Sequence, residues 1–196
     1  MRNRKAAITR NTKETSIKIE VNIDGKALSE IMTGILFFDH MLNQLAQHGM
    51  FDIKISATGS DDHHVVEDVA ICLGRAFSKA LEDRKGIVRM GDAVVPMDEA
   101  LAMVALDIGG RGYSVIEANF DHQKIGEMNS DLIRHFLVSF ASESKMNIYV
   151  KVLNGINDHH KAEAIFKALA RSLDKATRID SRIAGLYPST KEFIET

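Results

Sequence analysis

The chain repeats itself, and this repeat constrains the fold more than any other feature of the sequence. The stretch Asp62-His63-His64-Val65-Val66-Glu67 returns as Asp158-His159-His160-Lys161-Ala162-Glu163, so both copies read D-H-H-x-x-E. His40 lies 23 residues before His63, and His135 lies 24 residues before His159. Further upstream, residues 14–21 resemble residues 99–106. Three similarities in the same order indicate a duplicated unit of about half the chain.

Hydrophobic periodicity predicts the elements of each half. Residues 15–23 alternate apolar and polar side chains, as a half-buried strand does, and residues 38–48 carry an apolar helical face. A strand over 50–57 and a helix over 63–83 complete the first half. The second half is expected to contain strands near 98–108 and 112–120, a helix over 130–144, a strand over 146–153 and a helix over 159–177.

The order of these elements predicts an α+β fold in which a β-β-α-β-α unit occurs twice. Residues 1–94 are expected to form the first half and residues 95–196 the second. Because each predicted helix has one apolar face, the helices are expected to pack on one face of each sheet.

Composition excludes several classes of protein. The 196 residues are 45% hydrophobic and 27% charged, as in a folded globular chain. A net charge of −2 does not favour binding to nucleic acid or an anionic membrane, and no apolar run reaches the roughly 18 residues that span a bilayer. The basic first eleven residues lack the apolar core of a signal peptide, so a cytoplasmic protein is expected. The single cysteine, Cys72, lies among apolar residues and predicts a buried thiol.

The histidine pairs have the spacing of metal ligands. On a helix, His63 and Glu67 share a face and His64 is rotated by about 100°, so each motif offers ligands in two directions. Asp62 and Asp158, which precede the pairs, are expected to cap the two helices. The candidate ligands are six imidazoles and two carboxylates: His40, His63, His64, Glu67, His135, His159, His160 and Glu163.

Eight ligands suit two ions with four protein ligands each. Six-coordinate ions would then keep two open positions, which is typical of a catalytic site. Imidazole and carboxylate ligands without thiolate suit Mn, Fe, Co or Zn, and coordination above four favours Mn or Fe. The remaining histidines, His48 and His122, have no partner copy and are expected at the surface, where either could contact a substrate.

Three segments are candidate anion sites. Arg89 and Arg111 each lie near glycine-rich backbone, where a guanidinium group can hold phosphate by paired hydrogen bonds. The segment Pro188-Ser189-Thr190-Lys191 offers hydroxyls, backbone N–H groups and an ammonium group in one short turn. The residues alone therefore predict a dinuclear metalloenzyme with an anionic substrate. A dinuclear hydrolase acting on a small phosphorylated substrate, and a metal-storage or structural metal protein, are the alternatives.

These motifs resemble the imidazoleglycerol-phosphate dehydratase family of histidine biosynthesis. The similarity runs in order from about residue 5 to Lys191, and it is carried by residues 38–42, 62–68, 96–101 and 159–168. It implies a duplicated fold similar to ribosomal protein S5 domain 2, Mn²⁺ as cofactor with two ions per active site, and an assembly of 24 subunits built from trimers. The implied reaction removes water from D-erythro-imidazole glycerol phosphate to give imidazole acetol phosphate.

The resemblance also implies roles for single residues. One metal ion would be held by His40, His64, His160 and Glu163, and the other by His63, Glu67, His135 and His159. The implied substrate contacts are Glu14, Gln44, Arg89, Arg111, Ser189 and Lys191, with the basic residues and Ser189 at the phosphate. The reaction needs a carboxylate to take a proton from the carbon attached to the imidazole ring. We expect Glu163 to be this base, with Glu14 as an alternative acid–base group.

Two positions depart from the family pattern. Gly109-Gly110-Arg111-Gly112 stands where the family usually reads Ser-Gly-Arg-Pro, which retains the arginine in a more flexible loop. Glu192 follows Lys191 where the family often has glycine, and it brings a carboxylate near the expected phosphate. These departures bear on the conformation of the loop and the tail and leave the implied reaction unchanged.

Overall fold

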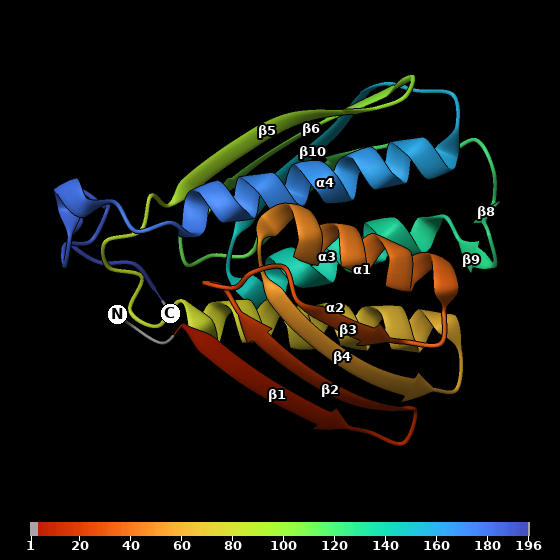
Figure 1. The fold of residues 1–196 in the computed structure, drawn as a ribbon, viewed down its shortest axis with the longest axis horizontal. Helices are drawn as coiled ribbons and strands as arrows, with labels where there is room; N and C mark the ends of the chain where they lie inside the picture. Colours follow the sequence, from red (N-terminus) through yellow and green to blue (C-terminus); the bar gives the residue numbers. More distant parts are fainter. Residues whose placement is uncertain (1–3, 196) are drawn as a thin grey trace.

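A computed structural model describes residues 4–195 of the chain. Two four-stranded sheets form the outer layers of the molecule, and four helices lie between them (Figure 1). The first half contains β1 (Lys5–Asn11), β2 (Thr15–Asn22), β3 (Ser29–Met32), α1 (Leu36–Gly49), β4 (Asp52–Gly59) and α2 (Asp62–Ala80). The second contains β5 (Met90–Met97), β6 (Ala100–Asp107), β7 (Tyr113–Glu117), the short β8 (Lys124–Ile125) and β9 (Met128–Asn129), α3 (Asp131–Ser144), β10 (Asn147–Asn154), α4 (Asp158–Thr177) and the 3-10 helix η1 (Ser181–Ile183).

The two sheets have the same topology, which confirms the duplication. Their strand orders are β1-β2-β4-β3 and β5-β6-β10-β7, and in each the last pair is parallel while the other pairs are antiparallel. Corresponding residues lie 85 positions apart in the first two strands and 95 or 96 apart from α1 onward. The β8–β9 hairpin accounts for the change, because it is inserted before α3 without a counterpart in the first half.

Each half begins with a strand that the periodicity did not predict. β1 and β5 are edge strands, so each half reads β-β-β-α-β-α rather than β-β-α-β-α, and the short edge strand β3 was also not among the ranges predicted for the first half. The buried positions at their starts are Ala6 and Gly91, which give little apolar signal. The division expected between residues 94 and 95 falls inside β5.

The core lies between the sheets and the helix layer. Ile17, Ile19 and Val21 of β2 point inward and are almost fully buried, as their two-residue period requires. Between the helices, Phe136 stacks on Phe140 and Phe166. Cys72 is buried as expected, and burial raises the pKa of its thiol to about 11. Among residues 4–195, no helix is long and apolar enough to cross a membrane.

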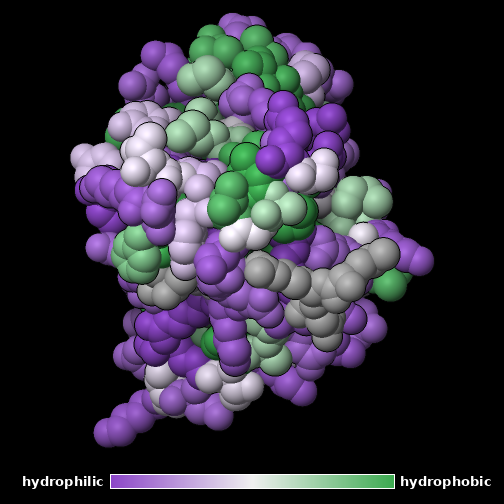
Figure 2. Space-filling model, turned by 90° about the vertical axis from the view of Figure 1, so that its left-hand side faces the viewer, coloured by the Kyte–Doolittle hydropathy of each residue, from purple (hydrophilic) through white to green (hydrophobic). Residues whose placement is uncertain are grey.

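All four helices run in the same direction. Their N-terminal ends lie together on the right of Figure 1, and α1 packs against α4 while α2 packs against α3. The chain after α4 lies at the opposite end, which faces the viewer in Figure 2. There, hydrophobic residues gather within a largely hydrophilic surface. Val88, Ile179, Leu186 and Phe193, on the segments of this end, are exposed apolar residues. The molecule therefore has a histidine-bearing end and a tail end.

Candidate metal centre

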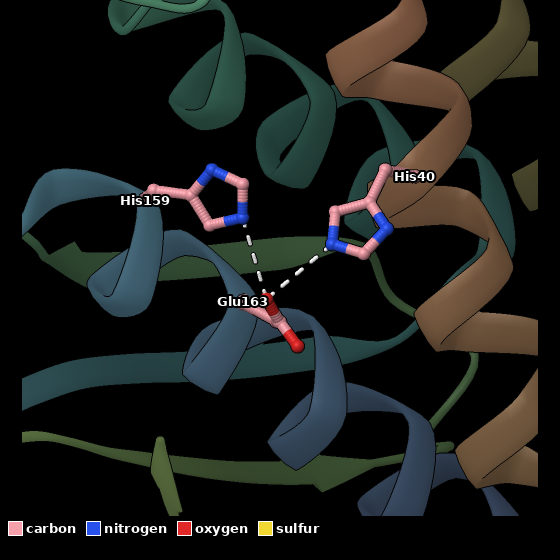
Figure 3. A group of neighbouring side chains, drawn as sticks. All are labelled: His40, His159 and Glu163. Carbon is pink, nitrogen blue, oxygen red and sulfur yellow. Dashed lines mark hydrogen bonds and ion pairs between the residues drawn. The ribbon is translucent and has the colours of Figure 1, made fainter. Parts of the chain in front are cut away.

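The first cluster joins α1 to α4. His159 and Glu163 lie one turn apart on α4, and His40 of α1 faces both of them (Figure 3). Glu163 Oε2 lies 3.3 Å from His40 Nε2 and 3.4 Å from His159 Nε2. One donor atom from each of the three residues lies within 4.8 Å of the others. Among the described residues, this is the set of acidic, histidine and cysteine side chains compact enough to share one ion.

Glu163 is buried, and its charge is balanced from the same helix. Lys167, one turn further along α4, places Nζ 2.7 Å from Glu163 Oε1. Burial alone would raise the pKa of Glu163, but the hydrogen bonds from Lys167 and His40 outweigh it, so the pKa is lowered. The carboxylate therefore stays charged although it is largely shielded from solvent. Lys167 was not among the predicted site residues, although its position four residues after Glu163 puts it on the same helical face.

The second cluster joins α2 to α3 and is the repeat copy of the first. The rings of His63 and His135 lie 4.8 Å apart between centroids, and His63 Nε2 lies 3.9 Å from Glu67 Oε2. The side chains of His63 and Glu67 are 49% and 44% exposed, whereas that of Glu163 is 9% exposed. The second cluster is therefore the more open of the two.

The outer histidine of each motif lies apart from its cluster. The ring of His64 is 6.0 Å from that of His63, and the ring of His160 is 6.2 Å from that of His159. Each pair of rings is nearly perpendicular, as expected for adjacent helical positions. Within one chain, His159 lies with His40 rather than with His63, so this grouping differs from the one that the resemblance implied.

Carboxylates hold the outer histidines. His160 Nδ1 lies 2.7 Å from Glu99 Oε2, and this hydrogen bond raises the pKa of His160. The backbone N–H of Asn157 and the imidazole of His160 hold the pKa of Glu99 at about 2. His64 Nδ1 lies 2.9 Å from Asp61 Oδ2, and its Nε2 lies 3.8 Å from Glu14 Oε2. Each ring thus turns Nδ1 toward a carboxylate, which leaves Nε2 as the nitrogen for a further partner.

The expected helix caps are wrong by one residue. Asp61 caps α2 by accepting from the N–H of His64, and Asn157 caps α4 by accepting from the N–H groups of His159 and His160. Asp158 is buried instead, because it binds Lys161 Nζ at 2.9 Å and the backbone N–H of His122 at 2.8 Å. A capping residue has extended backbone geometry and precedes the first helical residue, and Asp158 is already helical.

The two histidines without a repeat copy differ in exposure. His122 is at the surface as expected, with 75% of its side chain exposed and Nδ1 bonded to Asp158. His48 is half-buried, and its Nε2 lies 3.1 Å from Gln44 Oε1. Burial lowers the pKa of His48, and the charges of Lys167 and Arg171 lower it further. Gln44, His48 and Lys167 therefore continue the first cluster along α1 and α4.

The remaining expected substrate contacts lie at the tail end. Arg89 Nε and Nη2 bind the two carboxylate oxygens of Asp107 at 2.6 and 2.9 Å, and Nη1 donates to the carbonyl of Pro188 at 2.8 Å. Of the five N–H groups of a guanidinium, two remain free for another partner. Arg111 is exposed and makes no hydrogen bond or ion pair with any residue of the described range. Ser189 Oγ accepts from the N–H of Lys191 at 3.2 Å and so closes a short turn.

The histidine clusters and the arginines are far apart within one chain. The N–H of Arg89 binds the carbonyl of Ala176 in the last turn of α4, whereas His159 is in its first turn. At 1.5 Å per residue, the helix separates these positions by about 25 Å. Glu14 and Gln44 lie with the histidines, and Arg89, Arg111, Ser189 and Lys191 lie at the other end.

Comparison with known proteins identifies the family. A sequence model of imidazoleglycerol-phosphate dehydratase matches residues 33–173. An imidazoleglycerol-phosphate dehydratase from Dehalococcoides mccartyi is 56% identical over 195 residues, which cover 100% of both chains. One from Methanococcoides burtonii is 54% identical over 90% of this chain and 94% of its own. The chain belongs to the imidazoleglycerol-phosphate dehydratase family.

An imidazoleglycerol-phosphate dehydratase is an enzyme of histidine biosynthesis that acts on imidazole glycerol phosphate. Solved structures of two such dehydratases have the same fold as this chain. The dehydratase from Staphylococcus aureus is 32% identical, with a TM-score of 0.83 over 90% of this chain and 99% of that one. The dehydratase from Pyrococcus furiosus, in complex with (S)-C348, is 34% identical, with a TM-score of 0.83 over 95% of this chain and 100% of that one.

Proposed function

We propose that this dehydratase converts D-erythro-imidazole glycerol phosphate to imidazole acetol phosphate with two Mn²⁺ ions per active site. The observation that carries the proposal is the compact triplet of His40, His159 and the buried Glu163. Its separations of 3.3 and 3.4 Å suit neighbouring ligands of one ion, because donors about 2.1 Å from a metal and at right angles to each other lie about 3 Å apart. The donors are nitrogen and oxygen without thiolate, which fits Mn²⁺.

The cluster residues would divide the work of binding and proton transfer. His40, His159 and Glu163 would hold one ion, and His63, His135 and Glu67 would hold the other. A bound ion supplies Lewis acidity, which makes an imidazole ring a better electron sink. Glu163 is the proposed base. Its Oε2 faces the two imidazoles and would bind the metal ion, whereas its Oε1 faces Lys167 and would take the proton. Glu14 is the alternative acid–base group, since it is exposed at the same end beside His64.

The substrate phosphate is proposed to bind Arg89, Arg111, Ser189 and Lys191. Imidazole glycerol phosphate has about five bonds of roughly 1.5 Å between ring and phosphorus, so the whole molecule, with its ring and its phosphate oxygens, reaches about 10 Å. The separation of about 25 Å along α4 is longer than the substrate. The complete active site would therefore combine the histidine end of one chain with the tail end of another. His64 and His160, which lie apart from the clusters, would complete the ligand sets in the same way.

This arrangement supports the closed assembly that the family resemblance implies. The proposed particle has 24 subunits built from trimers. Unlike ends of a chain give head-to-tail contacts, and these leave no unused site only when the assembly closes.

A single assay tests the reaction. The purified protein is incubated with Mn²⁺ and imidazole glycerol phosphate, and the ketone product is followed by its absorbance in alkali. Inorganic phosphate is measured in the same samples. Ketone without free phosphate supports the dehydratase, whereas phosphate release supports the dinuclear hydrolase. Bound metal with neither product supports a storage or structural role.

A further inference from the structure

Arg84 is a fully buried arginine, with 0% of its surface exposed. Within the described residues its guanidinium meets only oxygens of neutral groups: the carbonyl of Glu195 at 2.7 Å, the hydroxyl of Ser78 at 2.9 Å and the carbonyl of Ser144 at 3.5 Å. Its Nε has no hydrogen-bond partner among them. Burial lowers the pKa of Arg84. Burying a cation is costly, and among residues 4–195 the guanidinium is held by neutral oxygens alone, so these contacts call for a reason.

The contact that spans the largest distance in the sequence is the one to Glu195. The segment around Glu195 is held closely, because Ile194 is 3% exposed and a Cβ on Gly110 would lie 2.6 Å from the carbonyl oxygen of Glu195. Arg84 therefore fixes the end of the described chain against the loop that carries Arg111.

The phosphate-binding turn, residues 189–192, lies between two points at which arginines hold the backbone. Before the turn, the carbonyl of Pro188 accepts from Arg89. After it, Glu195 is held by Arg84. Ser189 and Lys191 bond to each other, and both are exposed or half-exposed. The turn thus lies at the surface, with Arg89 bound to the backbone before it and Arg84 bound to the backbone after it.

The turn is closed by hydrogen bonds to Ser189 from the N–H groups of Lys191 and Glu192, but its last residue has an unfavourable backbone conformation. Glu192 has a φ of 54°, in the left-handed region that favours glycine. A glutamate placed there by local preference alone would leave this region. The backbone conformation after Lys191 therefore depends on the contacts that follow it.

From these observations we infer that Arg84 is a positioning residue for the phosphate-binding turn. By holding Glu195, it keeps Ser189 and Lys191 beside Arg89 and Arg111, although it touches no substrate itself. The inference rests on the proposed function of these four residues.

The test replaces Arg84 with methionine, which keeps the length of the side chain and removes its charge. Hydrogen exchange is measured for residues 186–195, together with kcat and KM for imidazole glycerol phosphate and the affinity for phosphate-free 1,2,4-triazole. We expect faster exchange in this segment, a KM at least ten-fold higher, and an unchanged kcat. Binding of triazole should not change, because it uses only the histidine end.

Two further variants make the test decisive. Ile194→Ala loosens the same segment without leaving a buried charge, and it carries the test if Arg84→Met does not fold. Arg182→Met removes an exposed arginine, paired with Asp180, from the same end of the molecule, so its exchange and KM should match the parent protein.

Unchanged exchange in Arg84→Met and Ile194→Ala would overturn the anchoring. Faster exchange with an unchanged KM would overturn the positioning role. In that case, a raised KM in Arg89→Ala and Arg111→Ala shows that the proposed phosphate site survives, whereas an unchanged KM in these variants too shows that the site itself was wrongly proposed.

Discussion

The two histidine clusters are copies of one arrangement, yet they differ in what surrounds them. In the α1–α4 cluster, Glu163 is buried and paired with Lys167. In the α2–α3 cluster, Glu67 is half-exposed, and the position equivalent to Lys167 is Ile71. The two copies thus share their donor atoms, while a lysine balances the charge of the carboxylate in the α1–α4 cluster only.

The same difference extends along the two helix pairs. Gln44 and His48 bond to each other on α1, and their copies in α3 are Ser139 and Glu143. Glu143 turns to Arg75 of α2, at 2.7 Å. One helix pair therefore presents an amide and an imidazole beside its cluster, and the other has an ion pair at the equivalent position. The two clusters therefore have similar donor atoms and different surroundings.

The largest effect should come from exchanging the carboxylates of the two clusters for amides. Glu163→Gln is expected to keep the fold and to lower kcat by two or more orders of magnitude, because it removes the proposed base. Glu67→Gln should cost much less at saturating Mn²⁺. The rate is measured from the ketone product, and circular dichroism checks the fold. A near-normal kcat in Glu163→Gln would contradict the assignment.

The next effect concerns the arginines. Arg89→Ala and Arg111→Ala should each weaken substrate binding by about 1.5–3 kcal/mol, the value of a charge-assisted hydrogen bond, and leave triazole binding unchanged. Arg4 is the repeat copy of Arg89 and is bound to Asp24 and to the carbonyl of Thr177, so Arg4→Ala serves as the control. It should lower the melting temperature without discriminating between the two ligands. If Arg89→Ala behaves in the same way, the arginine is structural.

The third prediction concerns the mass of the assembly, which should fall when the metal is removed. Metal that binds only the assembled form stabilises it by mass action. Chelator-treated protein is expected to be a smaller species, a trimer, and Mn²⁺ should drive it into a much larger particle, as followed by light scattering. His40→Ala and His135→Ala should each weaken this response, since each removes a donor from one cluster. Metal-free protein of unchanged mass, with the metal loss shown by elemental analysis, would disprove the coupling.

The smallest effect should come from replacing Cys72 with alanine. Its repeat copy in the second half is Ala168. Because burial raises the pKa of the thiol to about 11, it stays protonated near pH 8 and should not react with thiol reagents in the folded protein. Cys72→Ala should cost about 1 kcal/mol of unfolding free energy, measured in urea. Rapid labelling of the native protein would show that this helix face is open to solvent.

Much of the fold follows from the sequence because its signals are local. The repeat and the apolar periodicity predicted α1 to α4 and the central strands within about three residues. The edge strands β1 and β5 were not predicted, because small residues, Ala6 and Gly91, occupy buried positions in them. An edge strand that buries little has little hydrophobic pattern to reveal it.

The site was less predictable, since its geometry depends on packing between helices. Sequence spacing shows that His159 and Glu163 share a helix face, but the position of His40 beside them follows from the contact between α1 and α4. The same holds for the separation of the arginines from the histidines, which arises because α4 runs the length of the molecule. Arg84 gave no signal at all, since its partner Glu195 is 111 residues away in the sequence.

The common direction of the four helices also sets the electric field at the histidine end. Each helix carries about half a positive charge at its N-terminus, and four such ends meet where a divalent cation is proposed to bind. The first turn of every helix contains one aspartate to oppose this field: Asp39, Asp62, Asp131 and Asp158. The four helix ends amount to about two positive charges, whereas the four aspartates carry four negative charges, so the aspartates outweigh the macrodipoles and add to the attraction of Glu67 and Glu163 for a cation. An anion near the same end would still meet the helix N–H groups, which makes the ionic composition of the buffer part of any measurement of metal affinity.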